Sequence, residues 1–145
     1  MSMENEKKFE PALIDYFCNW CTATAADLAG TSRLQYPANI RPVRVMCSGS
    51  VDSVYLLWAL LYGADGVIIG GCTPGNCHYI SGNYKARRRM AILKTTLKTL
   101  GLDEDRVWVR WISAAEGNKF ASIMNEFTQK MREKGPNPLK DRWDI

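Results

Sequence analysis

The chain has 145 residues, the usual length of one globular domain, and its 46% hydrophobic and 23% charged residues are ordinary values for one. A formal net charge of +4 does not by itself indicate nucleic acid as a partner. The first ten residues lack the apolar core of a signal peptide, and the longest apolar run, residues 54–62, is too short to span a membrane. We therefore expect a cytoplasmic protein that binds neither membrane nor nucleic acid.

The first third of the chain predicts two strands separated by a helix. Residues 12–17 are a short apolar segment that ends at Cys18, and a helix over residues 22–29 is stopped by Gly30. Residues 40–46 form the next strand, and its Pro42 suits only the start of a strand or a strand at the sheet edge.

The middle of the chain predicts a helix and a buried strand. Asp52 is a suitable N-cap for a helix over residues 53–62, which Gly63 ends. Residues 67–69 are fully apolar, as expected of a parallel strand that is covered on both faces.

Two further helices and a strand complete the pattern. Asn83 can cap a long helix that Gly101 ends, with one apolar face formed by Ala86, Met90, Leu93, Leu97 and Leu100. Residues 107–112 form a fourth strand, and Ser113 with Glu116 makes a capping box. The last helix has an apolar face made by Phe120, Ile123, Met124, Phe127 and Met131.

Strands and helices therefore alternate four times, which predicts an α/β fold: a small parallel sheet of about four strands with flanking helices, flavodoxin-like. We expect one domain over residues 11–136. Residues 1–10 and 137–145 lack periodicity and are expected to be extended termini.

Five cysteines carry the strongest chemical signal. They are Cys18, Cys21, Cys47, Cys72 and Cys77, and three of them follow the ends of predicted strands. Because the carboxyl ends of parallel strands meet at one edge of a sheet, the five side chains are expected to converge there. An odd count without a signal peptide argues against a secreted disulfide framework and favours metal or redox chemistry.

The cysteines alone leave several interpretations open. Thiolates bind both iron–sulfur clusters and zinc, and the spacing does not separate the two. Cys18 and Cys21 also form a C-x-x-C pair as in thiol–disulfide enzymes, although that chemistry leaves the other three cysteines unexplained. Buried structural thiols are the least specific alternative.

Long segments of the sequence resemble one family. They are residues 17–21 (FCNWC), 26–33 (ADLAGTSR), 36–49 (YPANIRPVRVMCSG), 63–72 (GADGVIIGGC), 74–89 (PGNCHYISGNYKARRR) and 112–120 (ISAAEGNKF). Together they resemble the delta, or D, subunit of the methyl-viologen-reducing hydrogenase of methanogens. The resemblance covers roughly residues 14–136.

The resemblance implies an electron-transfer subunit that carries one 2Fe–2S cluster. Such a subunit relays electrons from a hydrogenase or a formate dehydrogenase to the flavin-containing A subunit of heterodisulfide reductase, in a complex that bifurcates electrons. The chain departs from the family pattern at Ser50, Thr73 and Asn76, yet keeps all five cysteines. The pairs Cys18/Cys21 and Cys72/Cys77 could each hold one iron, which would leave Cys47 as the spare thiol.

Two further features bear on function. We find no nucleophile–base set and no phosphate-binding loop, so we expect no catalytic residues and no turnover by the chain alone. The helix after Asn83 carries a basic face: Lys85, Arg87, Arg88, Arg89, Lys94 and Lys98. This face is either an ordinary solvated surface or a docking patch for an acidic subunit, and no nucleic-acid-binding motif lies beside it. Trp143, in the predicted tail, is expected to contact a partner.

Overall fold

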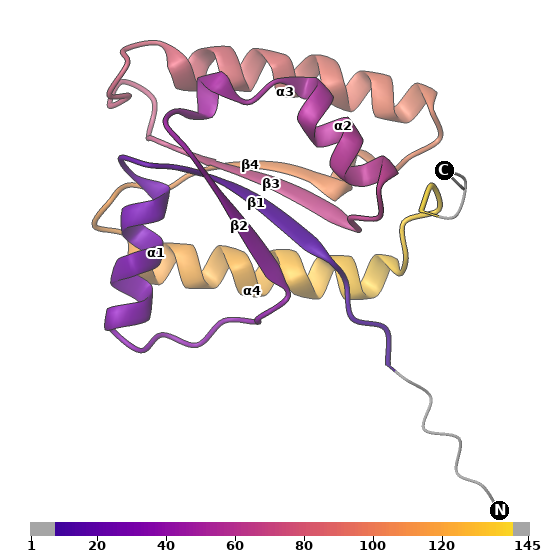
Figure 1. Cartoon of the computed structure of the whole chain (residues 1–145), viewed down its shortest axis with the longest axis horizontal. Coiled ribbons are helices and arrows are strands. Elements are labelled where there is room, and N and C mark those ends of the chain that lie inside the picture. The colour runs from indigo at the N-terminus through magenta and orange to yellow at the C-terminus, as the bar shows by residue number, and fades with distance from the viewer. Residues whose placement is uncertain (1–7, 141–145) are drawn as a thin grey trace, which may run out of the picture.

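The computed structural model describes residues 8–140 and shows a four-stranded parallel sheet with helices on both faces (Figure 1). Strands and helices alternate along the chain as the sequence predicts. The elements are β1 (Leu13–Cys18), α1 (Thr22–Thr31), β2 (Ile40–Val45), η1 (Ser48–Ser50), α2 (Ser53–Leu61), β3 (Gly66–Gly71), α3 (Gly82–Thr99), η2 (Glu104–Arg106), β4 (Val107–Trp111) and α4 (Gly117–Lys134).

The position of each strand follows from its composition. The strand order is β2-β1-β3-β4, and every neighbouring pair is parallel. Every residue of the apolar β3 is buried, as a strand with helices on both faces requires. β2 contains Pro42 and lies at the sheet edge, where a missing N–H donor is tolerated.

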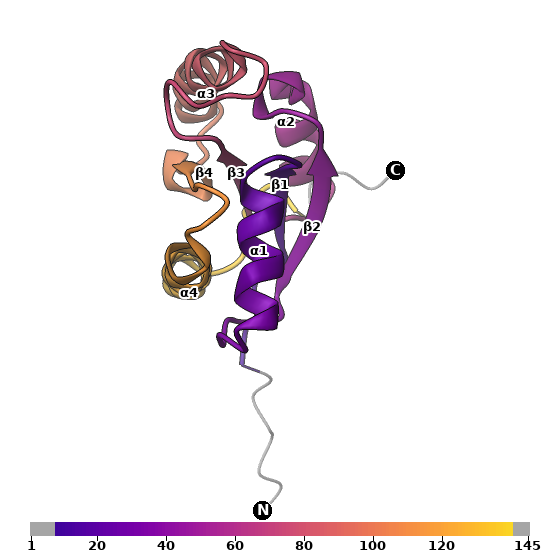
Figure 2. The ribbon, with the colours of Figure 1, turned by 90° about the vertical axis from the view of Figure 1, so that its left-hand side faces the viewer.

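Two helices cover each face of the sheet. α1 and α4 lie on one face and α2 and α3 on the other, as Figures 1 and 2 both show. Each face has its own apolar core. The first includes Leu13, Phe17, Phe120, Met124 and Phe127, and the second includes Leu60, Ile69, Met90, Leu93 and Leu97.

The strand order also fixes where a ligand site is expected. In a doubly wound sheet the chain reverses direction between β1 and β3, and ligands bind at the carboxyl ends of the strands at that switch point. These ends lie at the left of Figure 1 and face the viewer in Figure 2. Cys18 is the last residue of β1, and Cys72 follows β3 directly.

Some predicted helix boundaries are wrong in detail. The Asp52 side chain accepts a hydrogen bond from the Val54 N–H, which confirms it as the cap of α2. The predicted capping box forms only one hydrogen bond, from the Ser113 N–H to Glu116, because α4 begins after Glu116 at Gly117. Leu100, predicted to lie in the apolar stripe, is exposed because it follows the last turn of α3.

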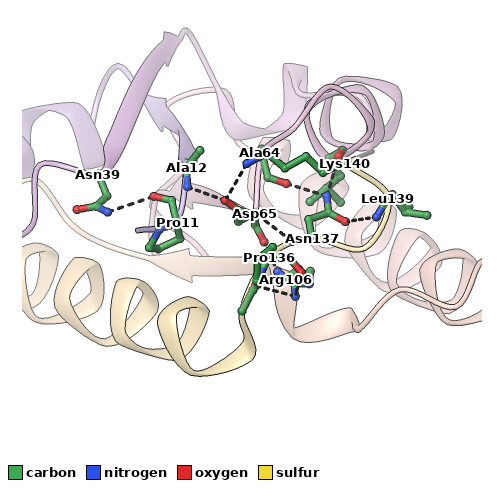
Figure 3. Close-up of polar contacts among 12 residues, drawn as sticks. Pro11, Ala12, Asn39, Ala64, Asp65, Arg106, Pro136, Asn137, Leu139 and Lys140 are labelled. Atoms are coloured by element: carbon green, nitrogen blue, oxygen red, sulfur yellow. Dashed lines mark hydrogen bonds and ion pairs between the residues drawn. The ribbon is translucent and has the colours of Figure 1, made fainter. Parts of the chain in front are cut away.

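The chain after α4 turns back onto the amino ends of the strands (Figure 3). Asn137 is buried, and its Nδ2 donates to the Leu60 and Ala64 carbonyls at 2.7 and 2.8 Å. The buried Asp65 carboxylate accepts from the Ala12 and Asn137 N–H groups at 2.8 and 2.9 Å. Residues 137–140 are therefore an anchored turn, where the sequence predicts an extended tail.

The division into a domain over residues 11–136 with extended termini otherwise stays a prediction, and Trp143 lies outside the described residues. Within residues 8–140, no helix has the length and apolar character needed to cross a membrane.

Candidate metal centre

All five cysteines lie at the carboxyl edge of the sheet, in the three connections that follow β1, β2 and β3. Cys18 ends β1, Cys21 is the N-cap of α1, and Cys47 follows β2. Cys72 follows β3, and Cys77 lies in the loop before α3. The convergence expected from the parallel topology is therefore present.

The sulfur atoms are close enough to share metal. The Sγ atoms of Cys18, Cys21 and Cys72 all lie within 4.8 Å of one another, and the three side chains are buried. Cys77 packs against this group, and its Sγ lies 3.7 Å from that of Cys47. Two sulfurs bound at about 2.3 Å to one tetrahedral ion are about 3.8 Å apart, so these separations suit thiolate coordination.

Hydrogen bonds at the site favour the thiolate form of two cysteines. The pKa of Cys18 falls to about 5 because Cys18 accepts a hydrogen bond from the Cys21 thiol and others from backbone N–H groups. The same bond raises the pKa of Cys21. Burial acts against ionisation of Cys77, but the N–H groups of Asn83 and Tyr79 outweigh it and lower its pKa. The thiolate is the form that binds metal.

Close backbone packing holds Cys47 and Cys77 together. A Cβ built on Gly82 would collide with the Cys47 sulfur, and one built on Gly49 would lie 2.6 Å from the Gly82 Cα. Only glycine allows η1 and the start of α3 to approach this closely. The sequence analysis does not single out Gly82, whose signal in the sequence is its place five residues after Cys77, at the start of a helix.

Asn83 has a different role from the predicted helix cap. α3 begins one residue earlier, at Gly82, and the buried Asn83 amide donates to the carbonyls of Cys72 and Thr73 at 3.0 and 3.1 Å. Asn83 therefore fixes the loop after β3 against the first turn of α3. The interaction holds the Cys72 end of this loop close to the start of α3.

An aromatic group forms one wall of the site. The Trp20 and His78 rings are stacked with centroids 3.9 Å apart, and Trp20 Nε1 donates to the Tyr79 hydroxyl at 3.3 Å. A cavity of about 300 Å³ lies beside this wall and is lined partly by Cys21 and Cys72. Trp20 therefore lies where its ring can limit the access of water to Cys21 and Cys72.

The donor set fits a thiolate-bound metal group. Four sulfurs, those of the buried group of three and of Cys77, are available without any carboxylate or histidine nitrogen among them. Soft sulfur ligands select iron–sulfur clusters, zinc or copper(I) over magnesium and calcium. The arrangement therefore supports the predicted chemistry.

A model of the methyl-viologen-reducing hydrogenase delta subunit family matches residues 13–135. The chain belongs to this family. The match spans the whole sheet and all five cysteines, in agreement with the resemblance identified from the sequence.

Named relatives are components of two kinds of complex. The iron-sulfur D subunit of an F420-non-reducing hydrogenase of Methanococcus voltae is 49% identical over 93% of this chain and 94% of its own length. The iron-sulfur D subunit of the F420-non-reducing hydrogenase of Archaeoglobus profundus is 49% identical over 90% of this chain and 95% of its own length.

A third relative is much longer. It is the A subunit of the ferredoxin/F420H2-dependent CoB-CoM heterodisulfide reductase of Methanosarcina acetivorans. It is 49% identical over 87% of this chain, which corresponds to 16% of that protein. A segment homologous to this chain is thus part of a longer reductase chain there.

The basic face of α3 is smaller than the sequence predicts. Arg89 is half-buried and donates hydrogen bonds to the carbonyls of Gly49 and Val51. It therefore supports the loop after Cys47, and a docking role is left to the exposed members of the face, Lys85, Arg87, Arg88 and Lys98.

Proposed function

We propose that the chain is an electron-transfer subunit that holds one 2Fe–2S cluster through Cys18, Cys21, Cys72 and Cys77. The observation that supports this best is the buried group of Cys18, Cys21 and Cys72, with Cys77 packed against it. Four thiolates are the ligand set of ordinary 2Fe–2S proteins. The iron–sulfur names of the relatives favour this cluster over zinc.

Cys47 is the fifth thiol and is proposed as the spare one. Burial opposes ionisation of Cys77, yet the backbone N–H groups of Asn83 and Tyr79 lower its pKa, whereas burial raises the pKa of Cys47 despite the Gly49 N–H that donates to it at 3.3 Å. N–H donors to ligating sulfurs are a common means of tuning cluster potentials. Cys77 also packs against the group of three buried cysteines.

The proposed role is that of a relay in a larger complex. A bound 2Fe–2S cluster accepts and donates one electron at a time, and the chain supplies the fold that holds and shields it. The donor is proposed to be a hydrogenase or a formate dehydrogenase. The acceptor is proposed to be the flavin-containing A subunit of heterodisulfide reductase, in a complex that bifurcates electrons between a heterodisulfide and ferredoxin.

Two observations support these partners. Relatives of nearly the same length are named as hydrogenase subunits. In other relatives the homologous segment covers 16% of the A subunit of a heterodisulfide reductase. A domain found both as a separate component of one enzyme and inside a chain of the other is suited to connecting the two.

The first test is anaerobic purification with metal and sulfide analysis. We expect about two irons and two acid-labile sulfides per chain, as one 2Fe–2S cluster requires, and one EPR signal after reduction. Stoichiometric zinc without iron would instead show a zinc-stabilised interaction module. A metal-free chain that is active in thiol–disulfide exchange would instead show a thiol–disulfide redox enzyme.

The second test is a set of single serine variants. Substituting Cys18, Cys21, Cys72 or Cys77 should lose the cluster or shift its potential strongly, and Cys47→Ser should retain iron. If Cys47→Ser loses iron while Cys21→Ser keeps it, the ligand set is wrong even though the cluster itself stands.

A further inference from the structure

Ile80 has an unusual conformation for its residue type. It lies in the loop between Cys77 and α3, with a φ of 69° in the left-handed region. That region is unfavourable for β-branched residues, and asparagine or glycine adopts it at lower cost. Backbone bonds hold the turn, from the Ile80 N–H to the Cys77 carbonyl at 2.9 Å and from the Ser81 N–H to the Tyr79 carbonyl at 2.8 Å.

Packing within the chain does not explain this conformation. The Ile80 side chain is 84% exposed, so it contributes almost nothing to either core. The free chain thus carries two unfavourable features at Ile80. Its backbone is strained, and its apolar side chain is exposed to water. Strained residues of this kind concentrate at binding sites, where a partner interaction compensates for them.

Ile80 is one of several exposed apolar side chains beside the cysteines. We define the mouth patch as Trp20, Met46, Tyr79 and Ile80, each exposed and each within three residues of a cysteine. Trp20 and Tyr79 are joined by a hydrogen bond, and the Met46 carbonyl lies 3.8 Å from the Cys18 Sγ. The patch therefore lies at the edge where the cysteines converge, which is where an electron must enter or leave.

Charge next to the mouth patch indicates the character of the partner. Residues 66–102 contain no aspartate or glutamate and six lysines or arginines. Lys85, Arg87 and Arg88 are exposed on the first turns of α3, a few residues beyond Ile80. A complementary surface would have an apolar centre with acidic groups on the α3 side.

We propose that Ile80 is the apolar anchor by which the A subunit of heterodisulfide reductase docks over the cysteine edge. This inference rests on the proposed function and specifies its acceptor interface. The A subunit is the chosen occupant because homologous segments form part of that chain in two relatives, so a contact between the two is common to separate and fused forms. A few anchors carry most of the affinity of an interface, so one substitution should be measurable.

The test compares two exposed isoleucines in the complete, iron-loaded chain. Ile80→Asn keeps a residue suited to the left-handed region, and Ile80→Gly is a second variant that removes the side chain while relaxing the backbone. Ile92→Asn is the matched control, because Ile92 is 70% exposed but lies within α3 in ordinary helical conformation. Each variant is titrated separately with purified A subunit, with the hydrogenase and with a second copy of this chain, and iron content and thermal unfolding are measured in parallel.

We expect both Ile80 variants to keep their iron and to unfold at the same temperature as the wild type or a higher one. Their Kd for the A subunit should rise about tenfold or more, as for an interface hot spot, while Ile92→Asn should stay close to wild type. Unchanged affinity in either folded Ile80 variant overturns the proposal. So does a loss of binding confined to the hydrogenase, or to a second copy of this chain. Wild-type protein that binds no A subunit refutes the proposed function itself, and this inference with it.

Discussion

The indole of Trp20 stacks on the imidazole of His78, with ring centroids 3.9 Å apart and planes inclined by 14°. The two residues come from different loops, one after β1 and one before α3. Their contact therefore joins the loop that carries Cys21 to the loop that carries Cys77. It also places an aromatic wall beside the cavity at the cysteines.

Removing this wall should expose the metal site without unfolding the domain. We expect Trp20→Ala to lose its visible spectrum several-fold faster under air or a chelator, because water and oxygen gain access to Cys21 and Cys72. Trp58→Ala is the control, since Trp58 is an exposed tryptophan on α2. Equal rates of loss for the two variants would show that Trp20 does not shield the site.

The sequence is sufficient to predict the parallel sheet and the convergence of the cysteines. The apolar β3 and the regular alternation of strands and helices define the topology, and the topology places Cys18 and Cys72 at neighbouring strand ends. Such features depend on local pattern and on general rules of strand connection. For that reason the order of residues along the chain is enough to infer them.

Features that depend on contacts between distant loops could not be predicted in this way. Asn83 is a reasonable helix cap by its position, yet its amide is used by the Cys72 loop because α3 packs against that loop. Asn137 follows the Gly–Pro pair that ends α4 and lies in a segment without periodicity, so the sequence predicts an extended terminus there. In the structure it bonds to residues more than 70 positions away. The left-handed conformation of Ile80 contradicts the preference of its side chain.

The second prediction concerns the close approach at Gly82. We expect Gly82→Ala to displace Cys47 and Cys77, because the added methyl group would overlap the Cys47 sulfur and lie 3.2 Å from that of Cys77. The measurement is iron content per chain after anaerobic purification, which should fall well below that of the wild type.

Gly30→Ala is the control for this substitution. Gly30 lies in α1 with ordinary helical conformation, and a Cβ there meets no atom within 4 Å. Alanine should keep the iron and stabilise the helix by about 0.5–1 kcal/mol. Full iron content in Gly82→Ala would mean that the loops relax to accept a side chain.

The third prediction concerns the anchored turn after α4. Asn137→Ala removes the donor to the buried Leu60 and Ala64 carbonyls (Figure 3), so it should lower the free energy of unfolding by about 2 kcal/mol. Asn39→Ala, which removes a partly exposed amide bonded to Glu10, should cost less than about 1 kcal/mol. Chemical denaturation of the two variants measures the difference. Similar values would show that the turn contributes little to stability.

The same turn changes how the role of the C-terminal residues should be tested. Truncation from residue 137 would remove Asn137 and destabilise the domain, so loss of partner binding would be ambiguous. Truncation after Lys140 keeps the turn and its ion pair with Asp65. It should leave the unfolding temperature unchanged while testing whether the last five residues, including Trp143, contribute to assembly.

The fourth prediction concerns Asp15, a fully buried carboxyl in the middle of β1. Neither of its oxygens has a hydrogen-bond partner of normal geometry within residues 8–140. Burial raises the pKa of Asp15 well above its ordinary value, and the backbone N–H of Gly70 offsets this only in part. The folded protein therefore keeps Asp15 protonated at a pH where the unfolded chain has released the proton.

The sign of the pH dependence follows from this difference. Above about pH 4 and below the raised pKa, the folded state binds one more proton than the unfolded state, so stability falls as the pH rises, by up to about 1.4 kcal/mol per pH unit. Asp15→Asn cannot ionise, so its stability relative to the wild type should increase from pH 5 to pH 8. Thermal unfolding of both proteins across this range measures the gap. Asp27→Asn, which removes an exposed carboxylate paired with Arg44, should show no such trend. A gap between Asp15→Asn and wild type that stays constant with pH would show that Asp15 is already ionised in the folded protein.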